Sequence, residues 1–408
     1  MKKVGAAIDI GTTTVVLHLI DLETGVKLAT VSGVNAQSPY GSDVTARIRY
    51  CKQNGHETLT QLIREQIASM MDEACSSVLS KTDEPSPCFV EYVTIAANTI
   101  MQHLLAGYSP VAMGVAPFTP FSLFGEELPA WEGLSIAKNA KIYYTPAISA
   151  YVGGDITAGL LAADFDSLSD PAIFLDIGTN GEIVLKHNGT YYCCATAAGP
   201  AFEGAEIEMG MAAESGAIDH VWLSKTGGQV PCPGYSTIGN TTPKGLCGSG
   251  LLDTLAVLLD IGAVDETGRL LGKDKFWVNE KHGIYITAGD IRKLQLAKAA
   301  IAAGIQVLLH FAGITEKDIK LLALAGGFGS YMDLQSAARI GLFPKTLLPV
   351  AKSYGNTAGE GAAMALCSKK ACTMLESIRT QCENIELSSI AFFNDKFVDE
   401  MSFEEPNE

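Results

Sequence analysis

The sequence lacks the cysteine and histidine spacings that usually bind metal ions. Its ten cysteines show no C-x₂-C or C-x₄-C-x₂-C pattern, and its seven histidines show no H-x₃-H or H-E-x-x-H pattern. Cys193 and Cys194 are adjacent in a predicted strand, where successive side chains point to opposite faces, which argues against joint metal binding. We therefore expect no zinc site and no iron–sulfur cluster within this chain.

Basic residues and long apolar runs are also scarce. The 29 Lys and Arg against 45 Asp and Glu give a net charge of −16, which argues against non-specific binding to nucleic acid or an anionic membrane. Asp9 and nearby glycines interrupt the apolar stretch after the first two lysines, unlike a signal peptide. No apolar run reaches the length of a membrane span. We expect a soluble, cytoplasmic protein with reduced thiols.

Two short segments, 7–21 and 174–188, have nearly the same pattern. They read AIDIGTTTVVLHLID and FLDIGTNGEIVLKHN, each an apolar run that ends in an acid, then Ile-Gly-Thr, then a second β-rich run. The pattern predicts a β-hairpin whose tight turn offers backbone N–H groups to phosphate oxygens. The acid before the turn can hold a divalent cation, usually through water. The residues concerned are Asp9, Gly11, Thr12 and Thr13 in the first segment and Asp176, Gly178, Thr179 and Asn180 in the second.

The pairing of these turns carries more weight than either turn alone. A single Asp-x-Gly-Thr turn is commonly an ordinary hairpin, because Asp and Gly favour turns for conformational reasons. Two matched turns predict two related half-domains that grip a nucleotide. A third segment, 321–343, runs from an apolar strand into Gly326, Gly327 and Gly329 and then a helix. Glycines there would let a flat ring or a ribose lie against bare backbone, although such junctions have other uses.

The order of predicted elements indicates a duplicated α/β architecture. At 408 residues, with 47% hydrophobic and 18% charged residues, the chain can bury a large core in two domains. We expect a first half over 1–165 with an insertion at about 105–140, and a second half over 166–370 with an insertion at about 199–243. The tail, 371–408, is expected to pack on the second half. Helices at 146–164 and 355–368 are expected to end the two halves and to meet.

This order resembles the superfamily of sugar kinases, heat-shock chaperone ATPases and actin, which implies a duplicated actin-like (ribonuclease H-like) ATPase fold with a nucleotide cleft between its halves. The local sequence is similar to a narrower group, the ATPase domain of the reductive activators of corrinoid proteins. The segments that carry this resemblance cover most of the chain: AIDIGTTTV, SPYGSDVTARIRY (38–50), AANTIMQHLLAG, VAPFTPF, YVGGDITAGLL, FLDIGTNGEIVL, AGPAFEGAEIEMGM, KGLCGSGLLD and LAGGFGSYMD.

The resemblance implies that ATP binding and hydrolysis drive the reduction of inactive cob(II)amide to cob(I)amide on a corrinoid protein of a methyltransferase or demethylase system. It implies ATP and Mg²⁺ as ligands and a homodimer. Many members of the group also carry a ferredoxin-like iron–sulfur domain. Because the first turn begins near residue 7 and the tail has no clustered cysteines, we expect electrons from a separate or missing ferredoxin-like donor.

Site roles follow from the motifs and the resemblance together. The glycines, threonines and Asn180 of the two turns are expected to hold the β- and γ-phosphates, and Asp9 and Asp176 to hold Mg²⁺ through its waters. Asp155 is the candidate for orienting the attacking water, with helix capping as its alternative. Gly326, Gly327 and Phe328 are expected to border the adenosine, and Gly248 either admits the ribose or allows tight packing. Glu203 faces the nucleotide or lies in a solvated loop.

Other functions remain open on the sequence alone. A small-molecule kinase of the same superfamily would share the turns, although no recognisable sugar-binding signature is present. An activator of the 2-hydroxyacyl-CoA dehydratase type would need two suitable cysteines per subunit, and only Cys247 lies at such a helix start. A non-catalytic, chaperone-like or actin-like binding module is the alternative outside enzymes.

Overall fold

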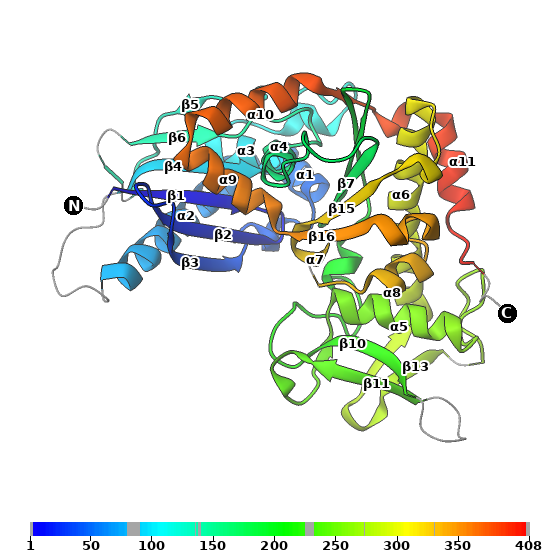
Figure 1. The fold of residues 1–408 in the computed structure, drawn as a ribbon. Coiled ribbons are helices and arrows are strands. Elements are labelled where there is room, and N and C mark those ends of the chain that lie inside the picture. Colours follow the sequence, from blue (N-terminus) through cyan, green and yellow to red (C-terminus); the bar gives the residue numbers. More distant parts are fainter. Residues whose placement is uncertain are drawn as a thin grey trace. The chain divides into compact units, whose positions relative to one another are not determined.

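The computed structural model describes residues 3–79, 90–134, 136–137, 140–224, 232–272, 274–329 and 331–404 (Figure 1). The chain divides into two units. The first comprises Met1–Leu168 with Asn356–Asn384, and the second Ser169–Gly355 with Ile385–Glu408.

A mixed sheet forms the centre of the first unit, in the order β3-β2-β1-β4-β6-β5. Its central strands are almost completely buried apolar runs, as expected for strands covered on both faces. β1 pairs antiparallel with β2 and parallel with β4, so the first phosphate turn lies at the carboxyl end of β1. The strands are β1 (Val4–Ile10), β2 (Thr14–Asp21), β3 (Lys27–Val34), β4 (Val90–Ala97), β5 (Glu127–Leu128) and β6 (Lys141–Tyr144).

Side-chain caps fix where several helices of the first unit begin. Asp43 accepts a hydrogen bond from the Ala46 N–H before α1, and Asn98 accepts one from the Met101 N–H before α3. The helices of this unit are α1 (Val44–Asn54), α2 (Glu57–Leu79), α3 (Thr99–Ala106), α4 (Gly154–Ala162), α9 (Thr357–Cys367) and α10 (Lys369–Gln381), and a short strand, β17 (Cys382–Asn384), follows.

Small residues let α4 and α9 pack closely against each other, as Figure 1 shows within the first unit. A Cβ atom added at Gly361 would lie only 2.0 Å from the carbonyl oxygen of Ala158. Alanines, including Ala7, Ala96 and Ala362, form the buried cluster around this contact. The expected meeting of the two linking helices is therefore confirmed.

The second unit repeats the strand plan of the first. Its strands run in the order β16-β15-β7-β8-β9. β7 pairs antiparallel with β8 and parallel with β15, and β1 of the first unit pairs in the same way with β2 and β4. The second phosphate turn again lies at the carboxyl end of the strand, β7, that makes this double pairing. These strands are β7 (Ala172–Ile177), β8 (Gly181–His187), β9 (Thr190–Thr196), β15 (Leu321–Ala325) and β16 (Ala351–Gly355). The duplicated α/β fold expected from the sequence is confirmed.

Helices and two small sheets surround this second sheet. The helices are α5 (Gly248–Asp260), α6 (Ala288–Ala312), α7 (Gly326–Gly329), α8 (Leu334–Arg339) and α11 (Ala391–Asp399). One small sheet holds β10 (Ala217–Ser224), β11 (Cys232–Thr237) and β12 (Gly245–Leu246), and the other holds β13 (Lys275–Asn279) and β14 (Ile284–Thr287).

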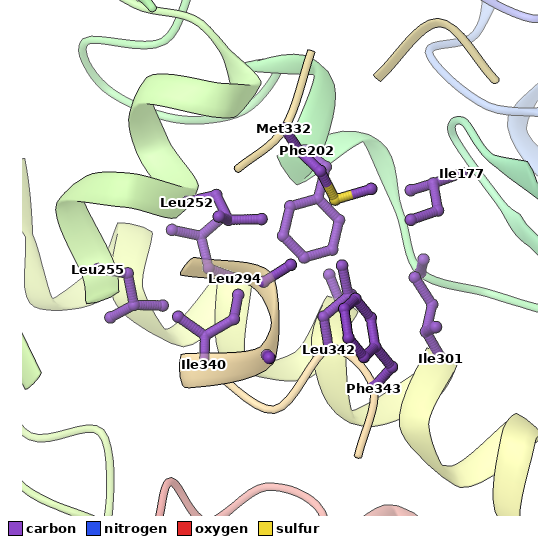
Figure 2. Close-up of a cluster of buried hydrophobic side chains, with 14 of the residues drawn as sticks. Ile177, Phe202, Leu252, Leu255, Leu294, Ile301, Met332, Ile340, Leu342 and Phe343 are labelled. Carbon is purple, nitrogen blue, oxygen red and sulfur yellow. The ribbon is translucent and has the colours of Figure 1, made fainter. Parts of the chain in front are cut away.

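The core of the second unit lies between its sheet and α5, α6 and α8. Figure 2 shows Ile177, Phe202, Ile301 and Phe343 within this cluster. Each such side chain contributes about 1.5–3 kcal/mol of burial free energy. Among the described residues, α6 is the one helix long and apolar enough to cross a membrane, but 78% of its most apolar window is buried inside the protein. This burial identifies α6 as a core helix.

The observed division differs from the expected one around residue 356. The sequence placed 356–370 in the second half and 371–408 against it, whereas Asn356–Asn384 belongs to the first unit. The cause is packing, because α9 contacts α4, β1 and β4. Ile385–Glu408 belongs to the second unit, as expected. The boundary near 165 lies within a few residues of the observed one at Leu168.

Candidate functional site

Both predicted phosphate turns are closed by their own glycine. The Gly11 N–H donates to the Thr14 carbonyl at 2.9 Å, and the Gly178 N–H donates to the Asn180 carbonyl at 2.9 Å. A Cβ atom at position 11 would lie 2.9 Å from that same carbonyl, so the turn needs glycine there. The two glycine N–H groups therefore hold the turns, which leaves the expected phosphate-binding role to the threonines and Asn180.

Three side chains hold the first turn in place by hydrogen bonds to Gly11 and Thr12. The buried guanidinium of Arg47, on α1, donates to the carbonyl of Thr12 at 2.5 Å and to the side chain of Gln37 at 3.0 Å. Asn35 donates to the Gly11 carbonyl at 2.9 Å, and Asn98 donates to the Thr12 hydroxyl at 3.2 Å. Sequence reasoning named none of these roles, although Arg47 and Asn98 lie inside two of the quoted motifs.

Asp9 is paired with the residue that starts α9. The Asn356 side-chain amide donates to Oδ2 of Asp9 at 3.0 Å, and its own oxygen accepts from the Gly359 N–H. Burial raises the pKa of Asp9 to about 6, while the hydrogen bond from Asn356 acts in the lowering direction. A nearby divalent cation would favour the ionised carboxylate, so this acid suits the metal role that the sequence assigned to it.

Asp155 lies in the first turn of α4, close to the first phosphate turn. Its Oδ1 accepts from the Ile156 N–H at 2.9 Å inside the helix, whose N-cap residue is Gly153. A Cβ atom at Gly153 would lie 2.7 Å from this oxygen and 2.4 Å from Cα of Asn98. Gly153 therefore lets Asp155 approach the Asn98 that contacts Thr12. Its water-orienting role stays a prediction.

The second turn is tied to Glu203. The buried Thr179 hydroxyl lies 3.2 and 3.1 Å from the two carboxylate oxygens of Glu203, at the end of a 3₁₀ turn (Pro200–Glu203). Glu203 is therefore next to the turn rather than in a remote solvated loop. Asp176 stands before the turn and is partly buried. It holds the place in the second unit that Asp9 holds in the first.

The glycine-rich segment after β15 reaches Asp176. Gly326 has a φ of 89°, and a Cβ atom there would lie 2.5 Å from Oδ1 of Asp176. Gly327 is exposed, with no atom within 4 Å of its Cβ position, so a flat ring has room beside it. The ring of Phe328 stacks on Phe202, with centroids 5.2 Å apart. The structure thus brings the second turn and the predicted adenosine segment together.

Gly248 serves packing in this arrangement. A Cβ atom there would lie 1.8 Å from the carbonyl oxygen of Phe202 and 2.8 Å from the ring of Phe328. No ribose is needed to explain this glycine, which favours the packing alternative. The neighbouring Cys247 is buried and contacts the Ile218 carbonyl and the Ser249 hydroxyl.

The donor set fits a nucleotide with a hard cation. Carboxylate oxygens and waters are the ligands that Mg²⁺ takes beside phosphate groups, and Asp9 and Asp176 each stand before a phosphate-type turn. Within the described ranges, no three His, Cys, Asp or Glu side chains gather closely enough to hold a metal ion alone. A cation at either acid would therefore complete its shell with water and phosphate oxygens.

Two α/β units of the same strand order, each with an acid–glycine–threonine turn, define an ATPase of the actin-like class. The family model described as the C-terminal domain of RACo, the ASKHA domain, matches residues 170–408, and the RACo middle region matches residues 4–168. The chain belongs to the RACo family of reductive activators of corrinoid proteins, which confirms the resemblance seen in the sequence.

Named relatives extend over nearly all of the chain. It is 34% identical to the corrinoid activation enzyme RamQ of Eubacterium limosum, over 94% of this chain and 68% of that protein. It is 26% identical to the [Co(II) methylated amine-specific corrinoid protein] reductase of Methanosarcina barkeri, over 98% and 77%. A solved reductive activator for corrinoid, iron–sulfur protein has 36% identity and a TM-score of 0.87. The chain covers 66% of that protein's length.

Proposed function

We propose that the protein is an ATP-dependent reductive activator, which returns inactive cob(II)amide on a separate corrinoid protein to cob(I)amide. The similarity to a corrinoid activation enzyme across 94% of the chain carries this proposal. Both phosphate turns and their acids lie within the matched regions. In each turnover the donor loses one electron, Co(II) gains it, and water cleaves ATP to ADP and phosphate.

The energetics of this coupling are feasible. For one electron, 59 mV corresponds to about 1.4 kcal/mol. An uphill gap of a few hundred millivolts therefore requires roughly 5–10 kcal/mol, which ATP binding and hydrolysis can supply. A conformation that binds the corrinoid protein differently before and after hydrolysis would convert this free energy into electron delivery or partner release.

We assign the residues as follows. Thr12, Thr13, Thr179 and Asn180 hold phosphate oxygens, and Asp9 and Asp176 hold the waters of Mg²⁺, which neutralises phosphate charge when bound. Asp155 orients the attacking water. Gly326, Gly327 and Phe328 border the adenosine. Gly11 and Gly178 act by closing their turns, and Gly248 by allowing Phe328 to pack.

The finer features of this proposal concern its partners. We propose a ferredoxin-like electron donor, because the ten cysteines of this sequence show none of the spacings that bind an iron–sulfur cluster. We also propose a cytoplasmic homodimer that serves a methyltransferase or demethylase system. Sedimentation of the purified protein with and without ATP measures its mass in solution. A monomer mass under both conditions would contradict the proposed homodimer.

ATP hydrolysis with and without a cob(II)amide-loaded corrinoid protein tests the function. With an external low-potential donor present, we expect the visible band of cob(I)amide only when ATP is added. ATP turnover without cobalt reduction, across several corrinoid proteins, would contradict the proposal. A search for a phosphate acceptor would then test the small-molecule kinase instead.

A further inference from the structure

A cavity of about 600 Å³ lies in the second unit, apart from the residues assigned to the nucleotide. Its walls come from β10, β11, α5 and the region of α8, and β10 packs directly on α5 (Figure 1). Its polar lining consists of His220, Ser236, Asp253, Asp260, Asp333 and Ser336. A volume of this size is typical of small-ligand or side-chain binding sites.

A histidine and a buried carboxylate form the centre of the cavity wall. Nδ1 of His220 lies 3.0 Å from Oδ2 of Asp253, which also accepts from the Val221 N–H at 3.3 Å. The Asp253 side chain is 4% exposed, whereas that of His220 is 46% exposed. Within the described residues, Oδ1 of Asp253 is buried and meets no donor at hydrogen-bond distance and angle, although the Ser336 side chain interacts with this carboxylate. A buried oxygen without a partner is costly, and an N–H donor would satisfy it.

The groups around this pair are acceptors and apolar surfaces. When Nδ1 of His220 donates to Asp253, Nε2 of the ring presents a lone pair. Asp333 accepts from the Ser336 N–H at the start of α8, and Asp260 forms an ion pair with Arg339. The lining side chains that add donors are the indole N–H of Trp222 and the serine hydroxyls. The Ser236 hydroxyl already donates to Asp219, and the Ser336 side chain is hydrogen-bonded to Asp253.

Trp222 gives the cavity an aromatic surface. Its side chain is 48% exposed. The indole lies against Gly234 of β11, where a Cβ atom would be 2.7 Å from its Nε1. Apolar residues, Val221, Leu223, Ala256 and Val257, complete the lining. An indole face attracts a cation, and an apolar wall accommodates the methylene groups that carry it.

We propose that this cavity binds a lysine or arginine side chain presented by the corrinoid protein partner. An amphipathic cation matches each part of the lining, since its N–H groups meet the acceptors and its stem meets the apolar wall. The net charge of −16 on the whole chain would also attract a basic partner surface. The identity of the partner, but not the cation site itself, rests on the proposed function.

Titration of the full chain with Nα-acetyl-lysine amide and Nα-acetyl-arginine amide tests the cation site. The readout is the indole N–H signal of Trp222 in NMR spectra, identified by its loss in Trp222→Phe, with Trp131 and Trp277 as internal references. We expect a saturable shift with both cations and at least fivefold weaker binding of uncharged Nα-acetyl-norleucine amide. Equal binding of norleucine, or no saturable shift, would overturn the proposal.

Variants locate the binding within the cavity. Asp253→Asn should weaken binding of the lysine derivative at least fivefold, and Asp274→Asn, an exposed acid of the same unit, should leave it unchanged. Asp253→Asn and Trp222→Phe should both stay folded, the latter because phenylalanine keeps an aromatic face. Their melting curves and their ATP hydrolysis without partner should match those of the wild type. Unchanged lysine binding in a folded Asp253→Asn protein would overturn the site.

Binding of a cob(II)amide-loaded corrinoid protein separates the two claims. We expect Asp253→Asn and Trp222→Ala to raise the dissociation constant at least tenfold, and Asp274→Asn to leave it unchanged. Unchanged partner affinity despite lost lysine binding would overturn the partner assignment. Failure of cobalt reduction in the wild type would instead contradict the proposed function, and the lysine titration would remain an independent test.

Discussion

At the scale of single residues, Asp9 occupies a partly buried place at the end of β1, beside Asn356. Burial raises its pKa from 3.8 to about 6. The native state therefore holds this proton at a higher pH than the unfolded chain does, and the free energy of unfolding falls as the pH rises from about 4 to 6. An acid that costs stability near neutral pH is typical of a site that serves a ligand.

Asp9→Asn should therefore raise stability and abolish turnover. Without nucleotide or cation, we expect the free energy of unfolding at pH 8 to rise by up to about 3 kcal/mol, with no gain near pH 4. ATP hydrolysis should fall at least a hundredfold. Denaturant melts across this pH range measure the first effect, with the exposed Asp72→Asn as the control. A gain that is equal at both pH values would show that the charge of Asp9 is not its cause.

Gly326 and Gly327 offer a matched pair of substitutions. A Cβ atom at position 326 would meet Asp176 at 2.5 Å in a backbone of positive φ, whereas one at 327 meets no atom within 4 Å. Gly326→Ala should weaken ATP binding more than tenfold and cost roughly 1–3 kcal/mol of stability. Gly327→Ala should leave the melting temperature unchanged. Calorimetric titration with ATP and thermal melts of both variants check this. Equal stabilities would refute the close approach at Asp176.

Arg47 tests whether the first turn needs a fixed geometry or only a positive charge. Lysine keeps the charge, but it cannot reach the carbonyls of Thr12 and Gly41 and the side chain of Gln37 together. We expect Arg47→Lys to raise the KM for ATP about tenfold and to lower stability by about 2–4 kcal/mol. Arg49→Lys, exposed on the same helix, is the control. Wild-type kinetics in Arg47→Lys would assign the effect to charge alone.

At the scale of elements, the contact between α4 and α9 gives the clearest prediction. Gly361→Ala would place a methyl group 2.0 Å from the Ala158 carbonyl and force the helices apart. We expect a loss of about 3 kcal/mol and a fall in the melting temperature of the first unit of roughly 6–12 °C. Met364→Ala, exposed on the same helix, should change little. Calorimetric melting of the full chain measures both, and an unchanged first transition in Gly361→Ala would contradict this packing.

The sequence predicted elements well where hydrophobic period and turn residues agree. The hairpins after Asp9 and Asp176 and the helix now seen as α6 follow from local patterns alone. The roles of Arg47 and Asn356 could not be predicted in this way, because Arg47 contacts the turn at Thr12 and Asn356 contacts Asp9, both distant in the chain. For the same reason α9 was placed in the second half, since no local pattern states which sheet a helix will cover. Nor does any local pattern show that Gly361 lies against Ala158, a residue about 200 positions earlier in the chain.

At the scale of the whole molecule, the repeated strand order explains why two distant motifs look alike. The β3-β2-β1-β4-β6 order of the first unit returns as β9-β8-β7-β15-β16 in the second, and each turn lies after the corresponding strand. Resemblance across many segments indicated the family more strongly than either turn. The cavity beside His220 was not predicted, because its lining comes from separate elements that no single motif joins.

The central claim of the proposed function is that ATP hydrolysis, which depends on the acids before the two turns, drives cobalt reduction. The most direct measurement is the rate of the cob(I)amide band in the wild type, Asp9→Asn and Asp176→Asn, with the same corrinoid protein and low-potential donor. We predict ATP-dependent reduction in the wild type and a loss of at least a hundredfold in each variant, although both stay folded. Reduction at the wild-type rate in either variant, or in the wild type without ATP, would contradict the account.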